Sequence, residues 1–362
     1  MRNMNNNKKN RILSFDMLRI VGAVSVLLTH ISAYIIIFFE KGIHYEWISG
    51  NTVQLLVYEA NPIFLMLSGA LLLQEKRSKE GLTFYKRSLM PAVILTIGWV
   101  SFYGLFYAVI LPLLENRSPD FQIFLDYFFK LKGSDYPHLW YMYMLIGLYL
   151  TIPILRLIVK KENIKYILIF VLISVIAQFI PEFIDPYFPN DGFKPGNYVK
   201  LFHLQPFMGQ TAYLLLGWFI VNFEIKKPVR IGIYSLAVLF GAINFIGLKE
   251  GFIVRDSIFN GLSIASLLWG VAVFMAIYYF FRDKTAKTRI AGELAKLSFG
   301  VYALHVLFLE LFVRFILPYD SFVPQEPVLY IAVAFVCICG ISLLISFLMS
   351  RIRGLKAIIR YK

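Results

Sequence analysis

Ten apolar runs, each long enough to cross a lipid bilayer, are the main constraint on how this chain can fold. A hydrocarbon core of about 30 Å takes about 20 apolar residues in a helix, and a helix satisfies its backbone hydrogen bonds internally. The runs cover residues 12–39, 52–73, 88–114, 137–158, 164–182, 204–223, 228–248, 256–281, 297–317 and 327–350. Charged residues make up only 16% of the chain, against about 25% in soluble domains. The sequence therefore predicts an all-α, polytopic membrane protein with about ten transmembrane helices.

Both ends of the chain are short and basic. Residues 1–11 begin like a secretory signal, but the apolar run that follows is far longer than the core of a signal sequence, about 7 to 15 residues. We therefore expect the first run to remain as a spanning helix. The predicted organisation is a basic N-terminal tail over 1–11, a single transmembrane domain over 12–350 and a basic C-terminal tail over 351–362.

Basic residues gather in every second connection between the runs. The richer side includes Lys8 and Lys9, Lys76 and Arg77, Lys160 and Lys161, Lys226 and Lys227, Lys284 and Lys287, and Arg351 and Arg353. By the positive-inside rule this side is cytoplasmic, so both termini are expected in the cytoplasm. The net charge of +14 then follows from topology, with anionic membrane lipids as the partner. A nucleic-acid partner is not expected, because it would need a basic face on a soluble domain.

The two cysteines lie in the last apolar run, at Cys337 and Cys339. Residues two apart on a helix point to different sides. We interpret both as small apolar side chains, and we expect neither a disulfide nor a metal site.

The first run carries three ionisable residues within FDMLRIVGAVSVLLTH, residues 15–30. Arg19 and His30 are eleven residues apart, so on a helix they differ by about 20° around the axis and about 16 Å along it. Asp16 precedes Arg19 by three residues and can pair with it. One interpretation is an ion pair at the membrane interface, with Arg19 reaching the headgroups. The other is a functional site, because charges are costly inside a bilayer.

His30 is expected near the middle of the membrane, where an imidazole needs a partner or a cavity. A hydrogen-bonded structural histidine is one possibility. A neutral imidazole, with an ordinary pKa near about 6.5, can also take a proton from a hydroxyl and return it to a leaving group. His30 is therefore a candidate general base.

Four stretches, in order along the chain, resemble motifs of the acyltransferase-3 family of bacterial integral membrane acyltransferases. Arg19 and His30, with ten residues between them, resemble its first-helix signature. NPIFLMLSGALLL (61–73) is similar to its second-helix motif, HLWYMYMLIGLYLTIPIL (138–155) to its H-x-W helix, and LSFGVYALHVLF (297–308) to its S-x-x-x-Y-x-x-H helix. The resemblance covers most of the chain.

The resemblance implies transfer of an acyl group, usually acetyl, from acyl-CoA to a hydroxyl of a cell-envelope glycan or a lipid-linked sugar, in a bacterial cytoplasmic membrane. It assigns His30 as the catalytic histidine and Arg19 as its essential partner. It also implies that Lys86 and Arg87 bind the CoA phosphates, although the family usually carries more arginines before the proline that follows. Arg and Lys suit phosphates as charge-assisted donors. Transfer through an acylated histidine is an alternative to direct attack by the hydroxyl.

Other residues are candidates for substrate contacts. Tyr302 and His305 match the closing motif and are expected at the site, with Asp16 supporting Arg19. Trp140 and His138 begin the fourth span, where aromatic residues often lie at the membrane interface, and acceptor binding is the alternative.

Glu310 and Arg314 are four residues apart in the ninth span. This spacing on a helix predicts a local ion pair between them.

Two other functions fit the same composition. One is a transporter or flippase for a polysaccharide or small molecule, which should show repeats or broken helices in corresponding halves. The other is a membrane module that only binds a substrate. Transfer of labelled acetyl groups distinguishes the enzyme from both.

Overall fold

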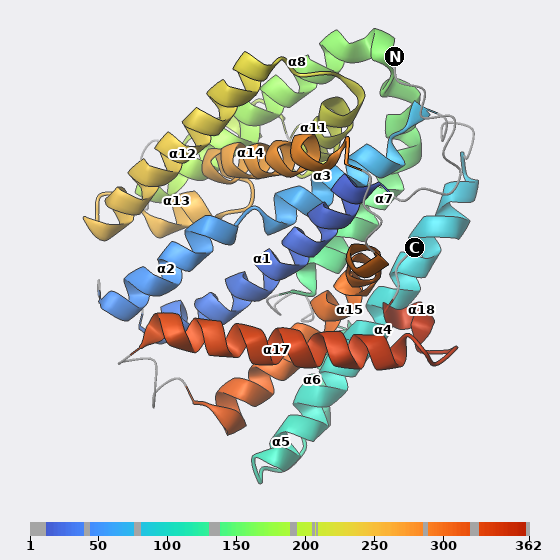
Figure 1. Cartoon of the computed structure of the whole chain (residues 1–362), viewed down its shortest axis with the longest axis vertical. Helices are drawn as coiled ribbons and strands as arrows, with labels where there is room; N and C mark the ends of the chain where they lie inside the picture. The colour runs from blue at the N-terminus through green and yellow to red at the C-terminus, as the bar shows by residue number, and fades with distance from the viewer. Residues whose placement is uncertain are drawn as a thin grey trace.

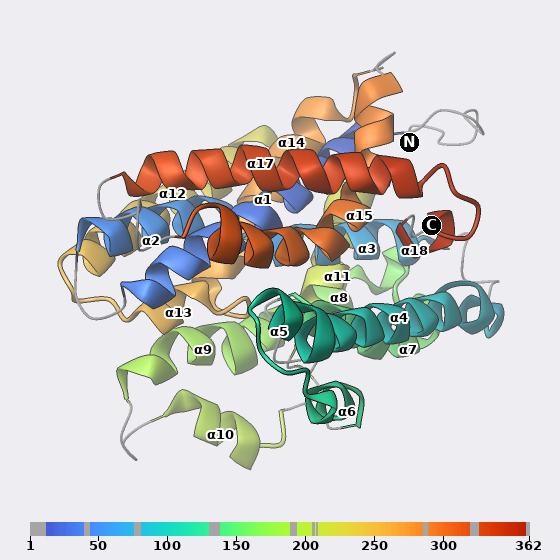
Figure 2. The same cartoon turned by 90° about the horizontal axis from the view of Figure 1, so that it is seen from below.

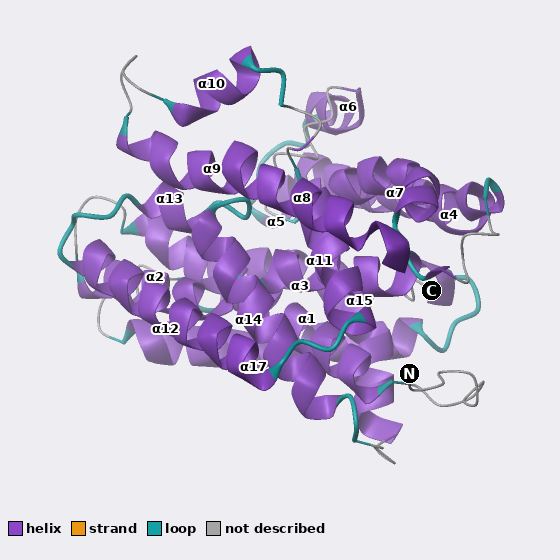
Figure 3. Cartoon of the chain, turned by 90° about the horizontal axis from the view of Figure 1, so that it is seen from above, coloured by secondary structure: helices purple, strands orange, loops and turns teal. Residues whose placement is uncertain are grey.

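The computed structural model describes residues 12–39, 44–75, 81–129, 138–188, 194–204, 207, 209–284, 289–318 and 326–359. Over these ranges the chain is helical and contains no strand (Figure 3). Nine helical segments in the described ranges are long and apolar enough to cross a membrane: Leu13–Phe38, Tyr45–Leu72, Tyr85–Leu114, Trp140–Ile158, Lys161–Tyr187, Lys227–Lys249, Ile264–Phe281, Ile290–Ile316 and Pro327–Met349. The predicted all-α, polytopic membrane fold is therefore confirmed.

The sixth predicted span, 204–223, forms a shorter helix than the other nine. It is helical only as α11 (Thr211–Asn222), whose 12 residues extend about 18 Å. Gly209, two residues before α11, has a φ of 97°, in the left-handed region that favours glycine. A residue in that conformation cannot belong to a right-handed helix, so α11 begins only after it. In the described ranges the structure thus has nine long spans, with a short apolar helix at the position of the sixth predicted span.

Helix α1 (Leu13–Phe38) occupies the middle of the bundle (Figure 1). It contacts α2 (Tyr45–Val57), α3 (Ala60–Leu72), α14 (Ile264–Phe281), α15 (Arg289–Leu311) and α17 (Pro327–Met349). Two hydroxyls of α1 bond back to carbonyls one turn earlier, Thr29 to Ser25 and Ser32 to Leu28, each at 2.8 Å. The hydroxyls of Thr29 and Ser32 are therefore satisfied within the helix itself.

The start of α1 and the end of α17 lie at the same end of the bundle, on the right of Figure 2. We call this the basic end. Lys86 and Arg87, at the start of the third span, belong to it, as does Arg156 in the last turn of α7 (Trp140–Ile158). The short helix α13 (Arg255–Phe259) lies toward the opposite end, on the left of Figure 2, and α6 (Phe121–Phe129) and α10 (Pro195–Leu201) lie below the long helices in that view.

Helices α3 and α11 touch backbone to backbone. A Cβ on Gly69 of α3 would collide with the carbonyl oxygen of Leu214, and a Cβ on Gly217 of α11 would collide with that of Met66. Small residues at helix contacts allow this close approach in membrane proteins. The two glycines therefore fix how α3 lies against α11.

The second span is broken into α2 and α3 at Tyr58 and Glu59. Pro62 has no N–H to donate to the carbonyl of Tyr58 four residues earlier, so the α-helical bonding is interrupted there. The side chain of Glu59 is buried at the break and accepts hydrogen bonds from Ser25 Oγ at 2.8 Å and Trp269 Nε1 at 3.1 Å. These contacts tie the break to α1 and α14.

The π-helix Phe312–Ile316 ends its span two residues before Pro318. Three other segments of π-helix lie inside longer helices, and each also ends two residues before a proline. They are Tyr85–Leu89 before Pro91, Phe106–Ile110 before Pro112 and Val175–Phe179 before Pro181. A proline removes one backbone donor, and a widened turn accommodates that loss within a continuous helix. The π-helix Phe106–Ile110 follows α4 (Met90–Leu105) and precedes α5 (Leu111–Leu114) within the third span.

Candidate active site

A cavity of about 370 Å³ lies between α1, α3, α4, α7 and α15. Its volume is in the range of about 300 to 1,000 Å³ that small-molecule sites occupy. The walls are mainly apolar or aromatic, and the polar residues among them are Arg19, Asn61, Ser68, Thr96, Tyr141, Tyr149, Lys296, Ser298 and Tyr302.

The cavity runs along the bundle from the basic end inward. Arg19 of α1 and Lys296 of α15 line the end near the start of those helices. Val26 and Tyr302, seven and six residues further along, line the deep end, about 10 Å away. The cavity therefore joins two cations at one end to an uncharged aromatic wall at the other.

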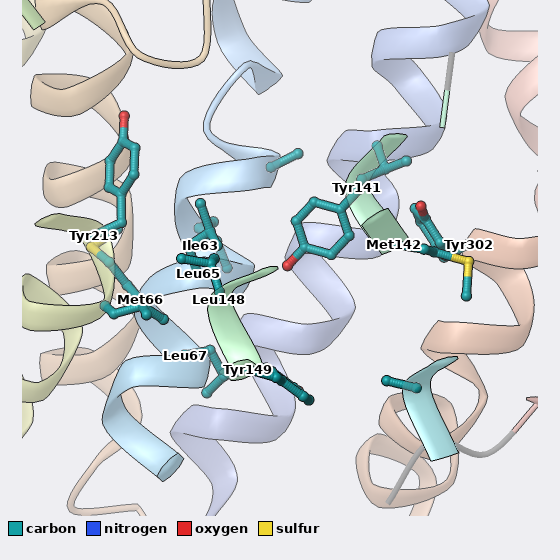
Figure 4. Close-up of a cluster of buried hydrophobic side chains, with 14 of the residues drawn as sticks. Ile63, Leu65, Met66, Leu67, Tyr141, Met142, Leu148, Tyr149, Tyr213 and Tyr302 are labelled. Atoms are coloured by element: carbon teal, nitrogen blue, oxygen red, sulfur yellow. The ribbon is translucent and has the colours of Figure 1, made fainter. Parts of the chain in front are cut away.

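The aromatic wall comes from α7 and α15, with Phe64 added by α3. Figure 4 shows Tyr141, Met142 and Tyr149 of α7 together with Leu67 of α3 and Tyr302 of α15, all of which line the cavity. The ring of Tyr141 extends from α7 toward α3 and lies 6.3 Å, centroid to centroid, from Phe64. Tyrosine supplies both an apolar ring and a hydroxyl, so this wall can contact apolar and polar groups of a ligand.

Each cation at the cavity has a carboxylate beside it on its own helix. Asp16 Oδ1 lies 3.3 Å from Arg19 Nη1, and the Arg19 side chain is 31% exposed. Glu293 Oε1 lies 2.5 Å from Lys296 Nζ. Both pairs have the three-residue spacing of helix neighbours. The predicted Asp16–Arg19 pair is therefore present, and it orients the guanidinium at the cavity.

His30 and His305 lie just beyond the deep end of the cavity. Nδ1 of His30 is 2.8 Å from the carbonyl oxygen of Val26, and Nδ1 of His305 is 2.6 Å from that of Tyr302. Nε2 of His305 is 3.3 Å from Nδ1 of His30, and the ring centroids are 4.8 Å apart. The carbonyls that hold both rings thus belong to residues that line the cavity.

These contacts favour one tautomer of each ring in its neutral form. A carbonyl can only accept, so Nδ1 carries the proton in both histidines. The lone pair of His305 is then on Nε2, facing the Nδ1–H of His30, and the lone pair of His30 is on its own Nε2. A neutral imidazole with its lone pair on Nε2 is able to accept a proton at that atom.

His138, in the turn just before α7, lies beside the two histidines. Its ring lies 5.4 Å from that of His305, 6.4 Å from that of His30 and 4.7 Å from that of Tyr103. The side chain is 1% exposed, and its carbonyl accepts a hydrogen bond from the Tyr302 hydroxyl. The membrane interface suggested for His138 by its position in the sequence is therefore wrong: the ring is buried within the protein, because α4 and α15 cover it.

A second polar layer lies further along α1 and α15. The buried carboxylate of Glu310 accepts hydrogen bonds from the hydroxyls of Tyr34 and Tyr107, and from Arg314 Nε at 2.8 Å. Arg314 also bonds Glu115 at 2.8 Å, and Glu115 in turn pairs with Arg117. Outside the spans, the hydrogen bond from Arg117 lowers the pKa of Glu115. The predicted Glu310–Arg314 pair is present and is part of this wider network.

The other predicted site residues lie away from the cavity. Lys86 and Arg87 are exposed on the π-helix at the start of the third span, and Trp140 is half-buried at the start of α7. None of the three is among the described residues that line the cavity.

Several cavity residues are not singled out by the sequence analysis, and the charged one among them is Lys296, which lies close to a basic connection. A signal was available in its spacing. Lys296 precedes His305 by about 14 Å of helix, as Arg19 precedes His30 by about 16 Å. In the part of the chain that the structure describes, no group of three or more His, Cys, Asp or Glu residues could hold a metal ion.

Fold and site together define a multi-pass membrane protein in which a cavity leads from two cations toward a group of three histidines. The family model described as an acyltransferase domain, acyltransferase-3, matches residues 12–348. The chain therefore belongs to the acyltransferase-3 family and is a membrane acyltransferase. Searches of curated proteins and of solved structures found no match to it.

Proposed function

We propose that the protein transfers an acyl group, acetyl in the first instance, from acyl-CoA to a hydroxyl of a cell-envelope glycan or lipid-linked sugar. The cavity between the two cations and the histidine pair carries this proposal. At one end it has the cations Arg19 and Lys296, which suit the phosphates of acyl-CoA. Beyond its other end lies the imidazole of His30, which suits proton transfer.

In this proposal, the acyl-CoA donor binds through the negative charges of its phosphates. CoA carries a pyrophosphate and a 3'-phosphate, which favour Arg and Lys as charge-assisted donors. Arg19 and Lys296 line the same end of the cavity and supply two such groups. The pantetheine arm would follow the cavity inward, past the aromatic wall, and bring the thioester toward His30. Lys86 and Arg87 lie at the same end of the bundle and would contribute at longer range.

The chemistry in this proposal is general-base catalysis by His30. Nε2 takes the proton of the acceptor hydroxyl, whose oxygen attacks the thioester carbonyl carbon. When the carbon–sulfur bond breaks, the same proton passes to the leaving thiolate, so that CoA leaves as a thiol. His305 supports the step by facing the Nδ1–H of His30, and Asp16 supports it by orienting Arg19.

The membrane orientation in this proposal follows the charge bias. The basic end faces the cytoplasm, where acyl-CoA is available, and anionic lipid headgroups surround it. The acceptor then approaches from the opposite side of the cytoplasmic membrane of a bacterium. Trp140, two residues after His138 and at the start of α7, remains a candidate for contact with the acceptor.

Transfer of radiolabel tests the proposal. Purified protein in nanodiscs is incubated with labelled acetyl-CoA and candidate acceptors, and the wild type is compared with His30→Ala and Arg19→Ala. We expect labelled acceptor only with the wild type. Transfer that survives both substitutions would overturn the site assignment. Absence of CoA binding together with substrate flux in liposomes would identify a transporter instead.

A further inference from the structure

His138 is the one member of the histidine group whose ring nitrogens are both without a hydrogen-bond partner among the described residues. The ring is 1% exposed, so water does not take the place of a partner. Buried polar groups are almost always hydrogen-bonded, and leaving one unpaired destabilises the folded protein. An unpaired imidazole next to a reaction site therefore points to a ligand that completes it.

The ring is held firmly despite its unpaired nitrogens. The Tyr302 hydroxyl bonds the His138 carbonyl, which fixes the backbone. Tyr103 packs edge-on against one side of the ring at 4.7 Å, and His305 packs against it at 5.4 Å. The polar atoms are thus oriented before any ligand arrives, which is the arrangement that stabilises a charge developing in a transition state.

The neighbouring donors are committed to other groups. The Tyr103 hydroxyl donates to the carbonyl of Ala303 at 2.8 Å, and that of Tyr302 donates to the carbonyl of His138. Nδ1 of His305 faces the Tyr302 carbonyl. A neutral imidazole has one N–H and one lone pair. The N–H of His138 is therefore a donor that makes no hydrogen bond to the described residues around it.

We propose that the N–H of His138 donates a hydrogen bond to the carbonyl oxygen of the reacting thioester. This inference rests on the acyl transfer proposed above. When the acceptor oxygen attacks, a carbon–oxygen bond forms and the carbonyl electrons move to the oxygen, while His30 holds the proton. The oxyanion is stabilised by His138. The electrons then return, the carbon–sulfur bond breaks, and the thiolate takes the proton from His30.

The kinetic test compares wild type with His138→Phe, which keeps an aromatic ring but has no polar atom. We expect kcat for acetyl transfer to fall about 10²- to 10³-fold, the usual effect of losing one oxyanion donor, with KM for acetyl-CoA unchanged. Stability should be retained or raised, because a buried unpaired group is removed. The exposed His44 provides the matched control, and His44→Phe should behave as wild type.

A second pair of variants covers the case in which the Phe variant does not fold. His138→Gln retains an N–H donor and His138→Met has a similar volume without one. The Gln variant should recover part of kcat and the Met variant should not. Equal activity in the Gln and Met variants, or an effect on KM alone, would overturn the proposal.

A spectroscopic measurement separates this inference from the proposed function. Acetyl-CoA labelled with ¹³C at the carbonyl is bound without acceptor, and its carbonyl stretch is recorded by infrared difference spectroscopy. We expect a lower frequency in wild type than in His138→Phe. The same frequency in both would reject the role of His138. If the carbonyl frequency is lower in wild type than in His138→Phe but wild type transfers no acetyl group, the hydrogen bond from His138 is supported. Only the proposed function is then rejected.

Discussion

Nδ1 of His30 and Nε2 of His305 face each other at 3.3 Å between α1 and α15. Each ring is also held by a carbonyl from the preceding turn of its own helix, at Val26 and Tyr302. The orientation of His30 therefore depends on a residue that is 275 positions away in sequence. The coupling between the two rings can be measured.

We expect the effects of His30 and His305 on catalysis to be non-additive. His30→Ala should lower kcat by about 10²- to 10⁴-fold, because it removes the proposed general base. His305→Ala should lower kcat less, since it only loosens the ring of His30. The double variant should be no slower than His30→Ala, because residues that act as a unit are not additive. Losses that multiply in the double variant, measured by acetyl transfer, would show that the two histidines act separately.

Lys296 should contribute to binding of the donor. Lys296→Ala removes a cation that lines the cavity, and a hydrogen bond to a charged group is worth about 1.5–3 kcal/mol. We expect KM for acyl-CoA to rise at least about tenfold, with the difference shrinking at high salt, and Lys296→Arg should restore binding. Lys160, whose nearest carboxylate is that of Glu162 at 4.0 Å, is the matched control. An equal effect of Lys160→Ala would indicate a general effect of charge.

The contact between α3 and α11 should tolerate no side chain. Gly217→Ala introduces a Cβ that collides with the carbonyl of Met66, and overpacking of this kind costs about 1–3 kcal/mol. Thermal unfolding in detergent should therefore occur at a lower temperature. Gly340 of α17 has open space at its Cβ position, so Gly340→Ala is the control. Equal unfolding temperatures for both variants would contradict the close contact.

An ion pair outside the spans gives a pH-dependent contribution to stability. Arg282 donates two hydrogen bonds to Glu224, at 2.5 and 3.0 Å, and these lower the pKa of Glu224. A lowered pKa stabilises the folded state above the unfolded pKa, about 4.3 for glutamate, and that stabilisation is lost as the pH falls through the folded value.

Glu224→Gln tests this contribution. Because the Glu224 side chain is 61% exposed, we expect the variant to lose less than about 1 kcal/mol at neutral pH. The difference from wild type should vanish in acid, where Glu224 is also uncharged. Unfolding temperatures across this pH range check it, with Glu162→Gln as an exposed control. A difference that grows in acid would contradict the sign.

Long apolar runs were enough to predict nine of the spanning segments, because length and hydropathy are properties of one helix at a time. The start of α11 could not be predicted in this way. It depends on the left-handed conformation of Gly209, which no local pattern in the run signals. The sequence therefore predicts where apolar helices occur more reliably than it predicts how long each of them is.

The site residues show the same contrast between features of a single helix and contacts between helices. Arg19 and Asp16 share a helix, and their three-residue spacing was enough to predict the ion pair. Their alignment with His30 also follows from the geometry of one helix. The positions of Lys296 and His138 depend on how α15 and α7 pack against α1, which spacing within a helix does not determine. The sequence was therefore enough to align the site residues of α1, whereas the positions of Lys296 and His138 beside them are known only from the structure.

The glycine contact between α3 and α11 has a consequence for how the cavity can change its width. With Gly69 and Gly217 pressed against backbone carbonyls, α3 has no room to slide or turn against α11. Six of the residues that line the cavity belong to α3: Asn61, Phe64, Leu67, Ser68, Leu71 and Leu72. The α3 side of the cavity is therefore a fixed wall. A change in cavity width that admits or releases a bulky molecule must come from movement of α4, α7 or α15.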